Sequence, residues 1–132
     1  KLGEEFGYDE INLNLGCPSK KVQKNKFGAC LRKEPDLVAE CLSKMQSSTK
    51  LPVTVKTRIG YDDQEDYENL YKFIDKLKNT GVKTFIIHER KAILGKFTPK
   101  QNVNIQPLKY DFVYNLKKDF KNEEIIINGC IK

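Results

Sequence analysis

The sequence of 132 residues has no tryptophan, one histidine, one methionine and only three arginines. Nor does any apolar run approach the roughly 20 residues needed to span a bilayer. The chain does not open with the basic and then apolar segment of a secretory leader. These absences argue against a membrane-spanning or secreted protein. Because the chain starts without a methionine and stops just after a strand-like run, we expect it to be a piece of a longer protein.

The four cysteines, at positions 17, 30, 41 and 130, form no Cys-x-x-Cys pair. With only His88 to assist them they do not make a usual zinc set, so no metal site is predicted. A disulfide framework is not expected in a lysine-rich chain without a leader, which favours a reducing compartment. The cytoplasm is the default location, with an organelle as the alternative. Cys41 falls on an apolar helix face and is expected to be structural.

The net charge of +6 comes from 21 lysines and three arginines against 18 acidic residues. Such a balance favours a polyanionic partner through phosphate attraction that does not depend on sequence. Because the lysines are spread along the chain, the same composition also fits a solvated surface. Charge alone leaves both interpretations open.

Strand-like and helix-like segments alternate along the chain. Ile11, Leu13 and Leu15 alternate with asparagines, which is typical of a strand, and Pro35 suits the first turn of a helix. The third strand is continuously apolar and is expected to be buried on both faces. The expected strands are 11–15, 52–56, 83–88 and 124–128, the expected helices are about 35–47, 67–77 and 107–116, and loops are expected at 16–31 and 89–106.

This β-α-β-α-β-α-β order implies parallel strands joined by right-handed crossovers. Each strand ends in polar or reactive residues, and in a (β/α)8 barrel the carboxyl ends of the strands build the active site. No Gly-x-Gly-x-x-Gly follows the first strand, which disfavours a dinucleotide-binding sheet. We therefore predict an α/β fold, an incomplete (β/α)8 TIM barrel with about four parallel strands.

The first strand ends at a side-chain amide and a thiol, Asn14 and Cys17. Gly16 and Pro18 break the strand, so the thiol is expected on the turn that leaves it. An amide beside a thiol could hold a small planar substrate next to a proton donor. Alternatively, Cys17 is a small buried hydrophobe and Asn14 a turn former.

Taken together, the strand ends resemble those of the tRNA-dihydrouridine synthases, flavin-dependent reductases of uridine in tRNA, closest to the A-type branch. The motifs follow the family's order and cover nearly the whole chain. They are Asn12-Leu-Asn-Leu-Gly-Cys-Pro-Ser19, Phe27-Gly-Ala-Cys-Leu31, Pro52-Val-Thr-Val-Lys-Thr-Arg-Ile-Gly60, His88-Glu-Arg90 and Ile127-Asn-Gly129.

The resemblance implies that residues 1–132 correspond to roughly strands 4 to 7 of a flavin-binding barrel. The opening strands, the last strand and a C-terminal helical domain would lie outside this sequence. It also implies FMN as cofactor, NADPH as reductant and tRNA as substrate, with hydride from reduced FMN reaching C6 of uridine. Cys17 would protonate C5, and Cys30 is its internal rival. We expect the 132 residues alone to be inactive. The oligomeric state is left open.

The remaining roles implied by the resemblance belong to the other strand ends. Asn14 would bind the uracil edge, and Arg58 would contact the tRNA or the flavin unless it forms a loop salt bridge. Residues expected to hold FMN are Lys56, His88, Arg90, Asn128 and Gly129.

Two positions depart from the family pattern. Cys130 stands where a second glycine is usual and could crowd the FMN phosphate, and Glu89 replaces a small residue and is expected to point away from the site. Lys91, Lys96 and Lys100 place positive charge in the long loop, either to meet tRNA phosphates or as part of a mobile surface loop. Two other functions are considered: a flavin barrel enzyme of the dihydroorotate dehydrogenase kind, and a non-catalytic basic RNA-binding piece.

Overall fold

The computed structural model describes residues 1–129, and the expectation about Cys130 lies outside them. Strands and helices alternate as the sequence predicts. In chain order the elements are α1 (Leu2–Glu5), β1 (Ile11–Leu15), α2 (Lys20–Lys24), the 3-10 helix η1 (Gly28–Lys33), α3 (Pro35–Ser48), β2 (Val53–Arg58), α4 (Tyr67–Lys78), β3 (Thr84–His88), α5 (Pro99–Asn104), α6 (Tyr110–Asp119) and β4 (Glu124–Asn128).

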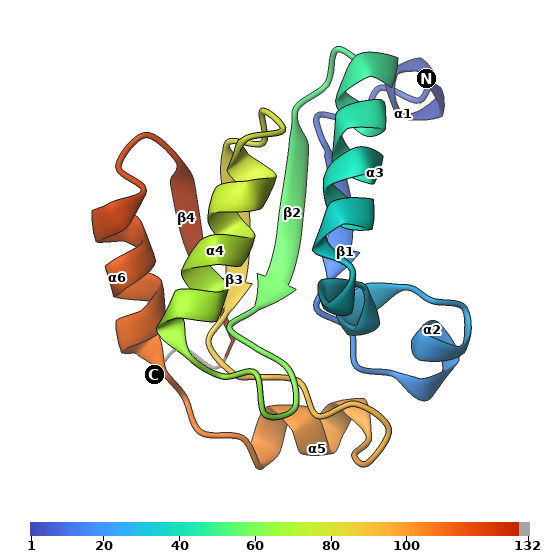
Figure 1. Ribbon diagram of the computed structural model, residues 1–132. Helices are drawn as coiled ribbons and strands as arrows, with labels where there is room; N and C mark the ends of the chain where they lie inside the picture. Colours follow the sequence, from blue (N-terminus) through green and yellow to red (C-terminus); the bar gives the residue numbers. More distant parts are fainter. Residues whose placement is uncertain (130–132) are drawn as a thin grey trace.

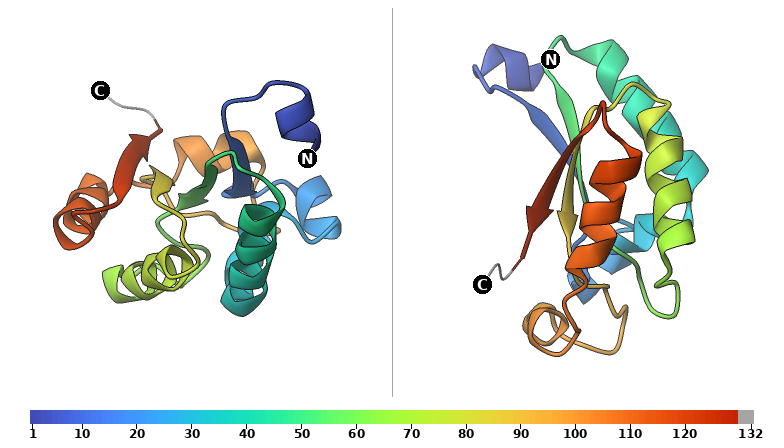
Figure 2. Two further views of the ribbon diagram at one scale, coloured as in Figure 1. Left: turned by 90° about the horizontal axis from the view of Figure 1, so that it is seen from above. Right: turned by 90° about the vertical axis from the view of Figure 1, so that its left-hand side faces the viewer.

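The four strands form one parallel sheet in the order β1-β2-β3-β4. The three longest helices, α3, α4 and α6, lie side by side on one face of the sheet (Figure 1). The edge-on view shows that no helix of residues 1–129 covers the other face (Figure 2). Neighbouring strands thus stand next to each other in chain order, each joined by a helix on the same side. This open sheet has the α/β architecture of part of a barrel, as predicted.

The hydrophobic core lies between the sheet and these helices. Alternate strand residues, such as Leu15, Val55, Phe85 and Ile87, point toward the helices and are fully buried. The helices contribute the other half of the core: Val38, Leu42, Leu70, Phe73, Ile74, Leu77, Val113 and Leu116.

Local signals start the two central helices. Pro35 occupies the first turn of α3, where its missing N–H is not needed. Asp66 caps α4 by accepting a hydrogen bond from the Asn69 backbone N–H at 2.7 Å. Both helices begin near the edge of the sheet at which β1 and β2 end, the edge that carries the polar residues (Figure 1).

Several local expectations are wrong. The segment 16–31 is not a loop throughout, because α2 lies within it and η1 begins there, and 89–106 contains α5. The second strand runs on to Arg58, since the pairing of β2 with β3 continues to His88. Cys41 is exposed, because Val38 and Leu42 define the buried stripe of α3.

The third strand is buried fully on one face only. Phe85 and Ile87 face the helices, whereas Thr84 and Ile86 are half-buried. Since adjacent strand residues point to opposite faces, these two lie on the face that no described helix covers. The expectation of burial on both faces is therefore wrong within the described chain.

Candidate active site at the strand ends

The parallel register brings the predicted site residues onto one face. Asn14 pairs with Lys56, Arg58 pairs with His88, and His88 pairs with Asn128. Paired residues of parallel strands share a face, so all five side chains lie on the face opposite α3, α4 and α6. This face would be the interior of a closed barrel, and these residues form its two rows nearest the carboxyl ends.

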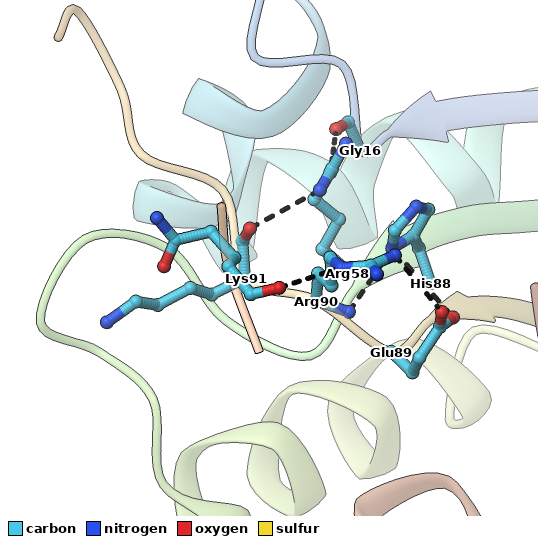
Figure 3. A network of polar contacts seen from close by, with 7 residues as sticks. Gly16, Arg58, His88, Glu89, Arg90 and Lys91 are labelled. Carbon is cyan, nitrogen blue, oxygen red and sulfur yellow. Dashed lines mark hydrogen bonds and ion pairs between the residues drawn. The ribbon is translucent and has the colours of Figure 1, made fainter. Parts of the chain in front are cut away.

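Arg58 is buried and joins the ends of different strands. Its Nε donates to the carbonyl of Gly16 at 2.8 Å, and its Nη1 donates to the carbonyl of Lys91 at 3.3 Å (Figure 3). Its own carbonyl accepts a hydrogen bond from Arg32 Nη1. Arg58 thus connects the turn after β1 with the loop after β3. The loop salt bridge considered from the sequence is absent among residues 1–129, since both acceptors are carbonyls.

His88 is a neutral hydrogen-bond donor. Burial, helped by the nearby cations of Arg58, Lys56 and Arg90, lowers the pKa of His88 to about 4. Its Nδ1 accepts the backbone N–H of Arg90 at 3.2 Å, so the ring proton is assigned to Nε2. The 3.9 Å approach of Glu89 to Nδ1 is therefore not an ion pair at neutral pH.

Lys56 carries charge on the same face without a carboxylate partner. It is half-buried, and no ion pair involves it within residues 1–129. Partial burial, followed by repulsion from Arg58, lowers its pKa, and the charges of Cys17 and Glu89 act in the opposite direction. Burial also lowers the pKa of Arg58, and the interaction with Cys17 opposes this lowering.

Gly28 supports the turn that carries Cys17. The Cys17 carbonyl accepts the backbone N–H of Ala29 at 2.9 Å. Gly28 has φ +66°, and a Cβ there would lie 2.5 Å from the same carbonyl oxygen. Only glycine fits this close approach. Gly28 was not predicted to belong to the site, although its place in the Phe27-Gly-Ala-Cys motif was the available signal.

The two thiols differ in their surroundings. Both Cys17 and Cys30 are free and half-buried. The Cys30 thiol approaches the carbonyl of Phe27 at 2.9 Å, within its own turn. Cys17 follows directly from the strand that carries Asn14. Cys17 is thus the thiol at a strand end, whereas the contact of the Cys30 thiol stays within its own turn.

Asn14 uses half of its amide locally. Its Oδ1 accepts the Gly16 backbone N–H at 2.9 Å, which stabilises the turn and assigns the NH2 group to the open side. The residue is exposed on the uncovered face. Asn14 is therefore both a turn former, as one sequence interpretation held, and an available donor.

Arg90 and Glu89 form a buried pair beside His88. Arg90 Nε donates to the carbonyl of Gln106 at 2.7 Å, and its Nη1 lies 3.6 Å from Glu89 Oε1. Glu89 is fully buried, and neither of its oxygens has a hydrogen-bond partner within residues 1–129. Its position in the sequence, between two polar residues, offered no signal for such burial.

The last strand ends at Asn128 and Gly129. The Asn128 carbonyl accepts the Glu89 backbone N–H at 3.3 Å, which joins β4 to the residue after β3. Gly129 has φ +126°, a conformation closed to other residues without strain. The Glu89 carboxylate fills the space where a side chain at 129 would begin. The Glu89 side chain therefore points away from the site, as expected, and also packs against Gly129, the last residue of the site.

The long loop after β3 is organised by Asn102. This buried side chain accepts the backbone N–H of Ile93 at 2.5 Å and donates to carbonyls of Ile93, Phe97 and Thr98. Lys91 pairs with Glu65 at 2.9 Å and is largely buried, so it is a poor candidate for a phosphate contact. Lys96 and Lys100 are exposed.

Residues 1–129 contain neither a metal-binding cluster nor a membrane-spanning helix. No group of three or more histidine, cysteine or acidic side chains is arranged to hold a metal ion. No helix in that range is both long enough and apolar enough to cross a membrane.

Comparison with known proteins gives consistent matches. The family description "Dihydrouridine synthase (Dus)" matches residues 1–132. The chain is 53% identical over 131 residues to a tRNA-dihydrouridine(20/20a) synthase of Synechocystis sp., and 56% identical over 131 residues to one of Shewanella oneidensis. Each match covers 99% of this chain and 39% of the relative, so the chain spans about two fifths of their length.

The fold also resembles a solved structure. A candidate phosphonomutase from Burkholderia cenocepacia superposes with a TM-score of 0.58 over 97% of this chain and 48% of the other. The sequence identity is 16%, so this likeness concerns the fold alone.

Proposed function

Because this chain belongs to the dihydrouridine synthase family, we propose that the complete protein containing it reduces uridine to 5,6-dihydrouridine in tRNA, with FMN as cofactor and NADPH as reductant. The named relatives are tRNA-dihydrouridine synthases, which supports this substrate. The observation that carries the proposal is the single face shared by Asn14, Lys56 and His88. The proposal concerns the complete protein, since the described sheet is open.

The donor chemistry of this face suits FMN. Lys56 offers a cation without a carboxylate partner, and His88 offers a neutral Nε2–H. Cations and hydrogen-bond donors stabilise the negative charge of a reduced flavin. We assign Lys56 and His88 to the flavin ring, with Arg90 behind them, and Asn128 and Gly129 to its phosphate end. When bound, the flavin supplies the hydride that reaches C6 of uridine.

Asn14 and Cys17 act on the substrate. The free NH2 group of Asn14 donates to a uracil carbonyl and orients the ring. The thiol of Cys17 gives its proton to C5, which balances the hydride added at C6, and the thiolate is reprotonated from solvent. Arg58 holds the turn that carries Cys17, because its Nε donates to the Gly16 carbonyl.

One experiment tests the whole assignment. The complete protein is purified, its flavin content is measured, and NADPH-dependent dihydrouridine formation is assayed on unmodified tRNA. We expect bound FMN and product. Absence of flavin would contradict the cofactor, and flavin without dihydrouridine would contradict the substrate.

A further inference from the structure

A cavity separate from the face described above lies between the first two β-α units. It encloses about 320 Å³ and is lined by parts of η1, α3, α4 and the loop after β2. These walls belong to two successive β-α units. Its lining residues include Arg32, Lys33, Tyr61, Lys72, Phe73 and Lys76.

Arg32 is the unusual member of this cavity. The residue is only 6% exposed, and its guanidinium lies 4.4 Å from the ring centre of Phe73 and donates to the Arg58 carbonyl. Its Nε is buried and has no hydrogen-bond partner among residues 1–129. Burial lowers the pKa of Arg32 to about 10, so it stays charged at neutral pH. No carboxylate of the described chain pairs with it, and a buried unpaired cation is unfavourable until it meets an anion.

The other three cations at the cavity have carboxylate partners on the surface. Lys72 pairs with Glu68 at 2.5 Å, Lys33 lies 3.6 Å from Asp62, and Lys76 pairs with Asp36. Exposed pairs of this kind contribute little stability, so a phosphate can compete for these lysines. Four cations against three carboxylates leave a net positive cavity.

An aromatic ring lies among the cations. Lys33 Nζ lies 5.5 Å from the ring centre of Tyr61, and Arg32 Cζ lies 5.9 Å from the same ring centre. Aromatic and cationic side chains together are the combination that binds single-stranded nucleic acid, with the base on the ring and the phosphate on the cation. Arginine suits a phosphate through its paired N–H donors.

The cavity is linked to the candidate active site through Arg58. Arg32 of η1 donates to the Arg58 carbonyl, and the Arg58 side chain lies in that site and donates to the Gly16 carbonyl. We propose that this cavity binds a backbone phosphate of the RNA substrate, with Arg32 and Lys72 as its ligands and Tyr61 against the adjoining nucleotide. This inference rests on the proposed function for the identity of the RNA.

The test measures equilibrium binding of unmodified tRNA to the complete protein over a range of salt concentrations. Lys72→Gln is expected to weaken binding at least threefold and to lower the salt slope by about one. Lys44→Gln is the matched control, because Lys44 also forms an exposed (i,i+4) pair, with Glu40 at 2.8 Å, but lies outside the cavity. It is expected to leave both quantities unchanged. Equal effects of the two substitutions would overturn the proposal.

Arg32 is tested with two substitutions. Arg32→Lys keeps the charge and Arg32→Gln removes it, and both are compared for flavin content and thermal unfolding. We expect tRNA binding to fall at least tenfold in Arg32→Gln and less in Arg32→Lys. A buried arginine can also matter for folding, so Arg32→Gln could fail to fold. In that case the tRNA affinity of Lys72→Gln tests the proposal, because the Lys72 side chain is 69% exposed.

Other outcomes separate this inference from the proposed function. A wild-type protein that forms dihydrouridine, with variants that bind tRNA normally, would overturn the cavity assignment alone. A raised KM for NADPH in Lys72→Gln with unchanged tRNA affinity would overturn the RNA ligand and assign the phosphate to the reductant. A wild-type protein that neither binds tRNA nor forms dihydrouridine would refute the proposed function first.

Discussion

The carboxylate of Glu89 occupies the space beside Gly129 into which any side chain at position 129 would project. The two residues are 40 positions apart and meet because β3 and β4 are neighbours whose ends coincide. Glu89 is fully buried there, against Arg90 on its other side. The backbone after β4, where the phosphate end of the flavin is proposed to bind, is thus shaped by a residue of the preceding strand end.

Gly129→Ala is expected to destabilise the complete protein and weaken FMN binding, since the new Cβ would lie closer than 3.0 Å to the Glu89 carboxylate. Gly95→Ala is the matched control: Gly95 also has positive φ, +77°, but nothing lies within 4 Å of its Cβ position. We expect the control to cost about 1 kcal/mol from backbone strain alone, and Gly129→Ala to cost more. Thermal unfolding and FMN titration measure both. Equal losses in the two variants would show that Glu89 does not matter.

A second substitution tests the same pair. Combining Gly129→Ala with Glu89→Ala removes the steric conflict, so part of the lost stability should return. The double variant is compared with each single variant by thermal unfolding. Simple additivity of the two losses would contradict the contact.

His88 should make stability depend on pH between about 4 and 6.5. Its folded pKa, about 4, lies below the ordinary value of 6.5, so the unfolded chain binds the proton more readily in that window. The contribution of His88 is complete above pH 6.5 and is lost as the pH falls toward 4. From pH 6.5 to 5 this loss amounts to about 1.5 kcal/mol, before most carboxylates titrate. Denaturant unfolding of wild type and His88→Gln measures it, and an unchanged pH slope in the variant would be the contrary result.

Cys17→Ala is expected to abolish most dihydrouridine formation while FMN remains bound, because the proton donor to C5 is lost. General acids typically contribute about 10²- to 10⁴-fold to rate, which sets the expected decrease in kcat. Cys30→Ala is the control, since this free thiol has similar exposure and a contact only within its own turn. Loss of dihydrouridine formation with Cys30→Ala alone would assign the role of general acid to Cys30 instead.

Asn102→Ala is expected to destabilise the loop after β3, because the Ile93 N–H and the carbonyls of Ile93 and Phe97 lose their side-chain partner, while the Thr98 carbonyl keeps only the backbone N–H of residue 102. Each unpaired buried group costs about 1–3 kcal/mol. Asn104→Ala, at an exposed position of the same helix, is the control. Hydrogen exchange of amides 92–98 measures the effect. Equal protection in the two variants would show that Asn102 does not organise the loop.

Much of the fold could be predicted from local patterns. The strand at 11–15 and the helix at 67–77 follow from hydrophobic periodicity, which reports directly which side of an element is buried. Short elements such as α2 and η1 could not be predicted, because they depend on contacts with the turn that carries Cys17. Cys41 was placed wrongly because periodicity defines a stripe on a helix but not its width.

The sequence by itself determined the order of the elements, the polar strand ends and the family resemblance, since each of these is written in residues close together along the chain. Only the tertiary structure decided that His88 is neutral, that Arg58 joins two strand ends and that Glu89 lies under Gly129. It also decided that Arg32 lies in a basic cavity without a carboxylate partner among residues 1–129. Burial and long-range contacts set these properties, and both arise from residues that are distant in the chain.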